Sequence, residues 1–321
     1  MRKTLAILVV AVFVIGLIAG CGGGAKQEQK PAQKFFNIAT GGTAGTYYPL
    51  GGAMAEIINK NIPGANASAQ SSGASVANVN LLKDGKVDLA LIQNDVAYYA
   101  FYGTEMFKDK KVTNFKAIST LYAEAVQIIA LEKSGIKSIA DMKGKRVAVG
   151  SRGSGTEANA RQILEQFGLT YNDITPQYLS FSEAANGLKD GNVDVAFVTA
   201  GFPTAAIQDI AAQHKIVLVP FEAAKADALI KKYPFFTKIK IPANTYAGQT
   251  ADVDAVALKA MLVVSDKLDA DTAYAITKAI YTNTDRLKAA HAQGKNITKE
   301  SAKDGVPIPL HAGAEKFFKE K

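Results

Sequence analysis

Val149-Gly150-Ser151-Arg152-Gly153-Ser154-Gly155-Thr156 follows an apolar run and precedes a helical stretch. Small residues let the backbone approach a ligand, and the free N–H groups of a first helical turn point toward an anion. A second loop of the same design, Gly41-Gly42-Thr43-Ala44-Gly45-Thr46, occurs earlier in the chain. If these two loops face one another in the fold, we expect them to bind one small ligand between them.

An internal repeat supports two similar halves. The segment 82–91, LKDGKVDLAL, is largely identical to 188–197, LKDGNVDVAF, and the two glycine loops recur at nearly the same offset. In each copy a helix ends at Lys-Asp-Gly, and an apolar strand follows, over 87–92 and 193–198. The sequence therefore predicts an α/β fold with two lobes, each a doubly wound sheet flanked by helices.

The lobe boundaries follow from the strands between these repeats. An apolar strand over 125–131 places the first crossing between the lobes near 122–124, and a strand over 216–220 predicts the return. We therefore expect the first lobe to comprise 35–122 plus 222–321, and the second 123–221.

Ligand-binding residues are expected where the strands end. In open α/β sheets, ligands bind at the carboxyl ends of strands, where strand-to-helix loops gather. Here those loops are rich in hydroxyls, amides and glycines. The candidate ligand-binding residues are Thr40, Gly41, Gly42, Gly45, Thr46, Tyr47, Ser72, Gln93, Asp95, Glu124, Ser151, Ser154, Gly155, Thr156, Gly201 and Phe202.

For four polar side chains in or beside these loops, the sequence allows two interpretations each. Asp95 binds ligand or caps a helix. Arg152 forms a bidentate clamp on an anion or is a solvated loop residue. Glu124, at the expected hinge, pairs with a ligand ammonium or forms a surface salt bridge. Tyr47 closes over the ligand or packs on the first helical turn.

Several classes of function are excluded by what the sequence lacks. The formal charge of +8 comes without a dense basic run, which argues against nucleic-acid binding. No lysine precedes Thr156 as in a Walker loop, and the three histidines have no zinc-type spacing and fall outside the junction loops. We therefore expect no catalytic residue, no metal and no cofactor.

The N-terminus has the pattern of an export signal. Residues 1–20 combine a short basic start with an apolar run, and Ile18-Ala19-Gly20-Cys21 resembles a bacterial lipobox. That resemblance implies a lipid on Cys21, the one cysteine, and an extracytoplasmic protein anchored to the cell membrane. An uncleaved N-terminal anchor is the alternative. Residues 21–34 are polar and predict a flexible tether.

The junction loops together resemble the TAXI family, the solute receptors of one branch of TRAP transporters. The matching stretches are 40–49 (TGGTAGTYYP), 72–78 (SGASVAN), 93–96 (QNDV), 144–150 (GKRVAVG), 153–156 (GSGT) and 309–315 (PLHAGAE). The resemblance implies a periplasmic-binding-protein fold of the second class, with two hinge crossings and a cleft that closes on ligand.

The resemblance also implies the function. We expect a receptor that delivers a small carboxylate or amino acid, glutamate-like or glutamine-like, to a TRAP permease driven by an ion gradient. One alternative is the receptor of an ATP-driven importer for a phosphonate-like or sulfonate-like anion. A two-lobe transferase and a signalling ectodomain are further alternatives, each with less support from the sequence.

Overall fold

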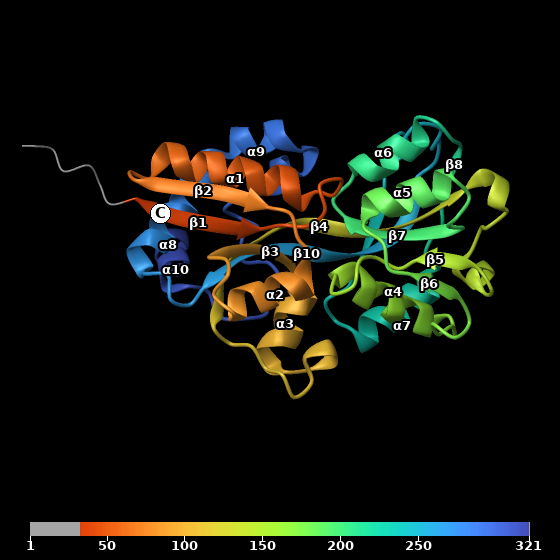
Figure 1. Cartoon of the computed structure of the whole chain (residues 1–321), viewed down its shortest axis with the longest axis horizontal. Helices are drawn as coiled ribbons and strands as arrows, with labels where there is room; N and C mark the ends of the chain where they lie inside the picture. The colour runs from red at the N-terminus through yellow and green to blue at the C-terminus, as the bar shows by residue number, and fades with distance from the viewer. Residues whose placement is uncertain (1–32, 321) are drawn as a thin grey trace, which may run out of the picture. The chain divides into compact units, whose positions relative to one another are not determined.

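The computed structural model describes residues 33–320 (Figure 1). The expected signal segment 1–20, the lipidation site Cys21 and nearly all of the expected tether lie outside the described residues. Among the helices of 33–320, none is both long and apolar enough to cross a membrane.

One ten-stranded sheet runs through both lobes in the order β2-β1-β3-β10-β4-β7-β5-β6, with β8 added to β4 and β9 to β10. Its two long central strands are antiparallel partners and pass from one lobe into the other (Figure 1). The strands are β1 (Lys34–Ala39), β2 (Ala65–Gln70), β3 (Leu89–Gln93), β4 (Phe115–Leu131), β5 (Arg146–Ala148), β6 (Thr175–Gln177), β7 (Val195–Ala200), β8 (Ile216–Leu218), β9 (Thr237–Ile241) and β10 (Val253–Ser265).

The first lobe buries both faces of its parallel strands. Along β3, Leu89 and Leu91 pack on one side, and Ala90 and Ile92 pack on the other, because successive side chains of a strand alternate between faces. Two groups of helices cover the two faces (Figure 1). They are α1 (Tyr47–Asn61), α8 (Ala270–Thr282), α9 (Thr284–Ala290) and α10 (Ala312–Lys319) on one side, and α2 (Ser75–Lys83) and α3 (Asn94–Tyr102) on the other.

The second lobe has the same layered build. Along β7, Val195 and Phe197 face one cluster, and Ala196 and Val198 face the other. Helices α4 (Gly155–Gln166) and α7 (Ala223–Lys232) cover the first cluster, and α5 (Phe181–Lys189) and α6 (Ala205–Ala211) cover the second. The short 3-10 turns are η1 (Glu105–Phe107), η2 (Glu132–Ser134), η3 (Ile139–Met142) and η4 (Ala292–Asn296).

An aspartate in each of the repeated segments, 82–91 and 188–197, makes an equivalent hydrogen bond in its lobe. The Asp88 carboxylate accepts the Asn37 N–H at 2.8 Å, and the Asp194 carboxylate accepts the Arg146 N–H at 2.8 Å. Each aspartate therefore fixes the entry of a buried strand against the neighbouring parallel strand. This pairing confirms that the repeat encodes two related lobes.

Strand β4 carries the chain into the second lobe, and the chain does not return at 222. Strand β4 leaves β10 and joins β7 at Ala125. Beyond 222, however, α7 stays with the second lobe: Lys225 donates to the Gln166 carbonyl at 2.7 Å, and Leu229 packs in one cluster with Ile163. The chain returns along β10, where Leu258 pairs with Glu124. The boundary at 222 therefore differs from the structure, since the strand at 216–218 pairs within the second lobe.

Candidate functional site

A small cavity of about 50 Å³ lies between the two lobes. From the first lobe and its hinge strand, it is lined by Gly41, Gly42, Gly45, Thr46, Tyr47, Ser72, Gly73, Ala74, Ser75, Gln93 and Glu124. From the second lobe, it is lined by Ser151, Ser154, Gly155, Thr156, Ser180, Phe181, Thr199 and Ala200. Its volume is room for roughly four water molecules, so it suits a small solute.

The loop before α4 brings backbone N–H groups to this cavity. Gly150 has a φ of 99°, a conformation that favours glycine, and a Cβ there would lie 2.9 Å from the Ser154 hydroxyl. Ser154 caps α4 by accepting the Glu157 N–H at 3.1 Å. The N–H groups of Gly155 and Thr156 precede the helical hydrogen-bonding pattern and are available to an anion.

Helices of both lobes begin at the cavity wall. In the first lobe, α1 starts at Tyr47 and α2 starts at Ser75. In the second lobe, α4 starts at Gly155 and α5 starts at Phe181. The positive ends of several helix dipoles therefore gather around one small space, as suits an anionic group.

Glu124 is the carboxyl group in the cavity wall. It is 2% exposed, and the Tyr47 hydroxyl donates to it at 2.9 Å. Burial raises the pKa of Glu124 to about 8, and the Tyr47 hydrogen bond opposes that rise. The same burial raises the pKa of Tyr47 well above its ordinary value. The interpretation of Glu124 as a surface salt bridge is therefore wrong.

Most of the predicted ligand-binding residues come together in this wall. The structure places there Gly41, Gly42, Gly45, Thr46, Tyr47, Ser72, Gln93, Glu124, Ser151, Ser154, Gly155 and Thr156. It does not place Thr40, Asp95, Gly201 or Phe202 there.

These outlying residues have structural partners instead. The Thr40 hydroxyl donates to the Gln70 carbonyl at 2.6 Å and joins the ends of two strands. The Gly201 carbonyl accepts from the Thr46 hydroxyl at 2.8 Å, and the Phe202 carbonyl accepts from the Gln293 amide at 2.6 Å.

Some wall residues were not predicted individually, although they lie in or beside the predicted junction loops. They are Gly73, Ala74, Ser75, Ser180, Phe181, Thr199 and Ala200. The Ser180 hydroxyl caps α5, which places the next residue, Phe181, at the cavity. Phe181 is the aromatic side chain of the second lobe in this wall, and its ring would lie 3.3 Å from a Cβ at Gly45. A helix-capping pattern at Ser180 is the sequence signal that could have found it.

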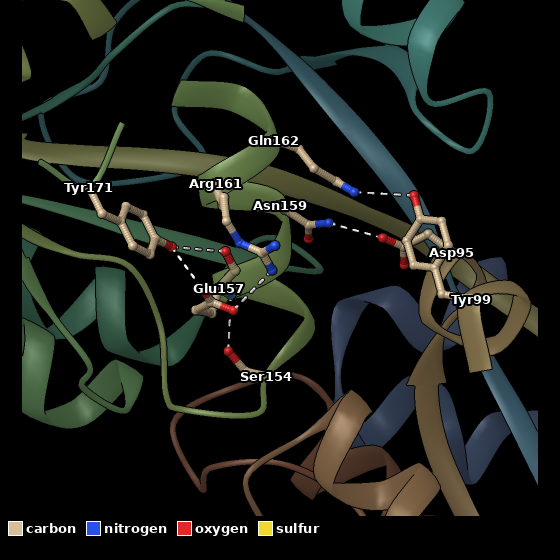
Figure 2. Close-up of polar contacts among 8 residues, drawn as sticks. All are labelled: Asp95, Tyr99, Ser154, Glu157, Asn159, Arg161, Gln162 and Tyr171. Carbon is tan, nitrogen blue, oxygen red and sulfur yellow. Dashed lines mark hydrogen bonds and ion pairs between the residues drawn. The ribbon is translucent and has the colours of Figure 1, made fainter. Parts of the chain in front are cut away.

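Asp95 lies beside the cavity, in a polar contact between the lobes (Figure 2). Its carboxylate accepts the Asn159 amide at 3.1 Å, and next to it the Gln162 amide donates to the Tyr99 hydroxyl at 3.2 Å. Asp95 is fully buried, and this burial raises its pKa to about 7. The residue before α3 is Gln93, so Asp95 stands inside the first turn, and its carboxylate accepts the Val96 N–H there.

Backbone contacts also join the lobes across the cleft. The Ala77 N–H donates to the Gly153 carbonyl at 3.0 Å, and the Ala206 N–H donates to the Ala44 carbonyl at 3.2 Å. Together with the Asp95 contact, these bonds hold the lobes in a closed arrangement.

Arg152 does not enter the cavity wall. Its guanidinium carbon lies 3.7 Å from the centre of the Tyr178 ring, a cation–π contact within the second lobe. The interpretation of Arg152 as an anion clamp is therefore not supported. Among residues 33–320, no group of three or more His, Cys, Asp or Glu side chains is placed to hold a metal ion.

Comparisons with solved structures show the fold. A putative L-cystine ABC transporter protein from Listeria monocytogenes is 19% identical, with a TM-score of 0.51, over 84% of this chain and 98% of that one. A protein from Bordetella bronchiseptica RB50 is 16% identical, with a TM-score of 0.52, over 88% and 82%. The chain has the two-lobe α/β fold of periplasmic binding proteins.

Sequence comparisons give a relative and a family. A putative aliphatic sulfonates-binding protein from Escherichia coli (strain K12) is 39% identical over 71 residues, and this match spans only 22% of either chain. These matches do not confirm the resemblance to the TAXI family, which stays a prediction. The model of the NMT1-like family matches residues 38–321. The chain therefore belongs to the NMT1-like family.

Proposed function

We propose that the chain is a solute-binding receptor that captures a small anionic solute between its lobes and presents it to a membrane importer. The observation that carries this proposal is the cavity between the lobes on which helix N-termini from both lobes converge. Backbone N–H groups at such termini bind sulfonate and carboxylate groups without a basic side chain.

Closure is the mechanism by which such a receptor reports its ligand. A ligand that touches Gly155 of one lobe and Thr46 of the other interacts more strongly with the closed arrangement than with an open one. Binding then shifts the population toward the closed form, and the importer recognises that form.

The proposed importer is an ATP-driven one. The relative from E. coli is named for aliphatic sulfonates, and the Listeria neighbour is named as an ABC transporter protein. These names support the sulfonate alternative better than the TRAP permease and glutamate expected from the loops. Neither is named as an enzyme, which leaves the transferase alternative without support. The neighbouring permease gene separates the two importers, because one class needs an ATPase and the other an ion-coupled permease.

The proposed receptor function requires an extracytoplasmic location. An anchor on Cys21 and a tether over 21–34 would hold the lobes beside an importer at the membrane. Lipid attachment remains a proposal, and mass spectrometry of the mature N-terminus tests it.

Calorimetric titration of the purified full chain with small sulfonates and carboxylates tests the receptor function. Thr156→Val keeps the side-chain volume but removes a hydroxyl from the cavity wall, so it should weaken binding about tenfold. Thr282→Val, on the exposed side of α8, is the matched control and should leave affinity unchanged. Equal affinity of Thr156→Val and the wild type would contradict the placement of the ligand.

A further inference from the structure

Three successive carbonyl groups of the second lobe, at residues 201–203, accept hydrogen bonds from side chains of the first lobe. In the order of these carbonyls, the donors are the Thr46 hydroxyl at 2.8 Å, the Gln293 amide at 2.6 Å and the His291 ring nitrogen Nε2 at 3.0 Å. His291 and Gln293 belong to the segment 291–296, which comprises η4 and the residue before it. This segment therefore binds the other lobe directly beside the cavity residue Thr46.

The segment 291–296 fits closely against the second lobe at the crossing of β4. A Cβ at Gly201 would lie 2.5 Å from Gln293 Cγ and 2.9 Å from the Tyr122 ring. Gln293 is 5% exposed, and its side-chain oxygen accepts the Asn296 amide at 2.7 Å, which fixes the orientation of its donor group. Because the contact lies beside a crossing strand, a rotation of the lobes about that strand lengthens or breaks its hydrogen bonds.

His291 makes a second hydrogen bond that fixes the protonation state of its ring. Its Nδ1 accepts the Gln293 N–H at 3.1 Å and thereby caps η4. Nε2 therefore carries the proton that it donates to the Pro203 carbonyl. A further proton on Nδ1 would face the Gln293 N–H, so that two donors would oppose each other. Protonation of His291 is thus incompatible with the cap that positions Gln293.

His311 makes the same pair of hydrogen bonds inside the first lobe. Its Nδ1 accepts the Gly313 N–H at 3.2 Å, and its Nε2 contacts the Leu268 carbonyl at 2.9 Å. The two histidines differ in the partner of Nε2, which belongs to the other lobe for His291 and to the same lobe for His311. His311 is therefore an internal control for what this arrangement contributes to folding alone.

The surroundings of His291 favour its neutral form. Burial lowers the pKa of His291 below its ordinary value, and the Pro203 hydrogen bond opposes this shift. Among the described residues 33–320, no charged side chain contributes to that pKa. Charged side chains on the neighbouring helices have other partners, in the pairs Arg286–Glu56, Lys288–Asp285 and Asp209–Lys189. Lys295 of η4 is exposed, and Tyr48 is the other ionisable residue in the wall of the surface groove that His291 lines.

On the basis of the receptor function proposed above, we propose that the segment 291–296 is a latch that stabilises the closed lobes, and that protonation of His291 releases it. In the open form the imidazole loses its partner in the other lobe and meets water. It then takes up a proton near its ordinary pKa of 6.5. Closure therefore weakens as the pH falls below about 6.5, and the receptor releases its solute more readily in acid.

Asp95 and Glu124 have the opposite effect on closure. Burial raises their pKa to about 7 and to about 8, so protonation in acid removes a cost of closing the lobes over them. The latch is therefore isolated by comparing the native chain with a variant that does not titrate at position 291. His291→Gln is that variant, because glutamine keeps an N–H donor for the Pro203 carbonyl.

Disulfide trapping measures closure without a ligand. A Cβ at Gly153 would lie 4.0 Å from the Ala77 Cβ in the other lobe, a separation that suits a disulfide. The full chain with Ala77→Cys, Gly153→Cys and Cys21→Ser should therefore form this bond only when the lobes close. Comparing variants at the same pH cancels the pH dependence of the thiols themselves.

In this trapping background, His291→Ala should slow disulfide formation about fivefold at pH 7.5, as expected for the loss of one hydrogen bond between the lobes. His311→Ala should leave the rate unchanged, although both variants lower the melting temperature. Between pH 7.5 and 5.5, the rate of the chain with His291, divided by that of His291→Gln, should fall by up to about tenfold.

Equal trapping rates for His291→Ala and His311→Ala would refute the latch. A ratio between the His291 chain and His291→Gln that stays constant with pH would refute its control by protonation. Because trapping needs no ligand, these results are distinct from a failure of the receptor function, which calorimetry would show as an absence of binding by sulfonates and carboxylates.

Discussion

Replacing Asp95 by asparagine should stabilise the ligand-free protein above neutral pH. The Asp95 carboxylate is fully buried, where it accepts the Val96 N–H at 2.7 Å and the Asn159 amide at 3.1 Å. Both donors are neutral. The charged groups that affect the pKa of Asp95 include Glu105, a carboxylate that raises it further.

The magnitude follows from the shift in pKa. Burial raises the pKa of Asp95 from 3.8 to about 7. The folded protein therefore holds this proton more tightly than the unfolded chain does. The stability that this tightly held proton of Asp95 contributes is fully present below about pH 4. It decreases as the pH rises and is lost above about pH 7. About three pH units at about 1.4 kcal/mol each give an upper limit of about 4 kcal/mol.

The surrounding contacts can accept the change. The side-chain oxygen of Asn159 is buried without a hydrogen-bond partner in the described part of the chain. Rotation of the Asn159 amide would let that oxygen accept from the amide introduced at position 95, while the remaining oxygen still accepts the Val96 N–H. Asp95→Asn therefore removes the charge, but the rotated Asn159 NH2 group loses its acceptor, a cost of about 1–3 kcal/mol that reduces the gain below the upper limit.

Urea unfolding of the full chain between pH 5 and 8.5 measures the effect. At pH 8, Asp95→Asn should unfold with a free energy higher than that of the wild type by about 1–3 kcal/mol. Its stability should also fall less steeply between pH 5 and 7.5. Asp271→Asn, at a side chain that is 93% exposed, is the matched control and should follow the wild type. Wild-type and Asp95→Asn curves that run parallel over the whole pH range would refute the reasoning.

Two further variants test closure and lobe stability. A Cβ at Gly155 would lie 1.9 Å from the Gln93 side-chain oxygen in the other lobe, so Gly155→Ala should displace the end of the Gln93 side chain and make closure less favourable. X-ray scattering should then show less compaction on addition of ligand than in the wild type, at unchanged melting temperature, and wild-type compaction would contradict this. Asp194 accepts the backbone and side-chain N–H groups of Arg146, so Asp194→Asn should lower the free energy of unfolding by about 1 kcal/mol. Urea unfolding at pH 7 measures this loss, and an unchanged midpoint would count against the pairing.

Local patterns made the cavity loops predictable. Glycines and hydroxyls at the ends of apolar strands indicate strand-to-helix junctions, and such junctions meet at one edge of a parallel sheet. The loops at Thr46 and Gly155 therefore come together as predicted. The repeat also makes Asp88 and Asp194 equivalent in sequence, and in the structure each carboxylate accepts a backbone N–H of the neighbouring parallel strand.

Contacts between distant segments were not predictable in the same way. Asp95 has the sequence context of a helix start, but its partner Asn159 lies in the other lobe, and no local pattern joins them. The return crossing was misplaced for the same reason. The segment after 222 looks like any helix and strand, and only its packing against α4 assigns it to the second lobe.

The buried acidic groups give closure a reason to depend on ligand. Closing the lobes withdraws Asp95 and Glu124 from water, and this burial raises the pKa of both carboxyl groups, with a neighbouring carboxylate raising each further. This cost disfavours an empty closed receptor at neutral pH. A ligand that contacts wall residues of both lobes offsets part of that cost only in the closed form, so it has a differential affinity for the two states. An importer that recognises the closed form would then be presented mainly with loaded receptor.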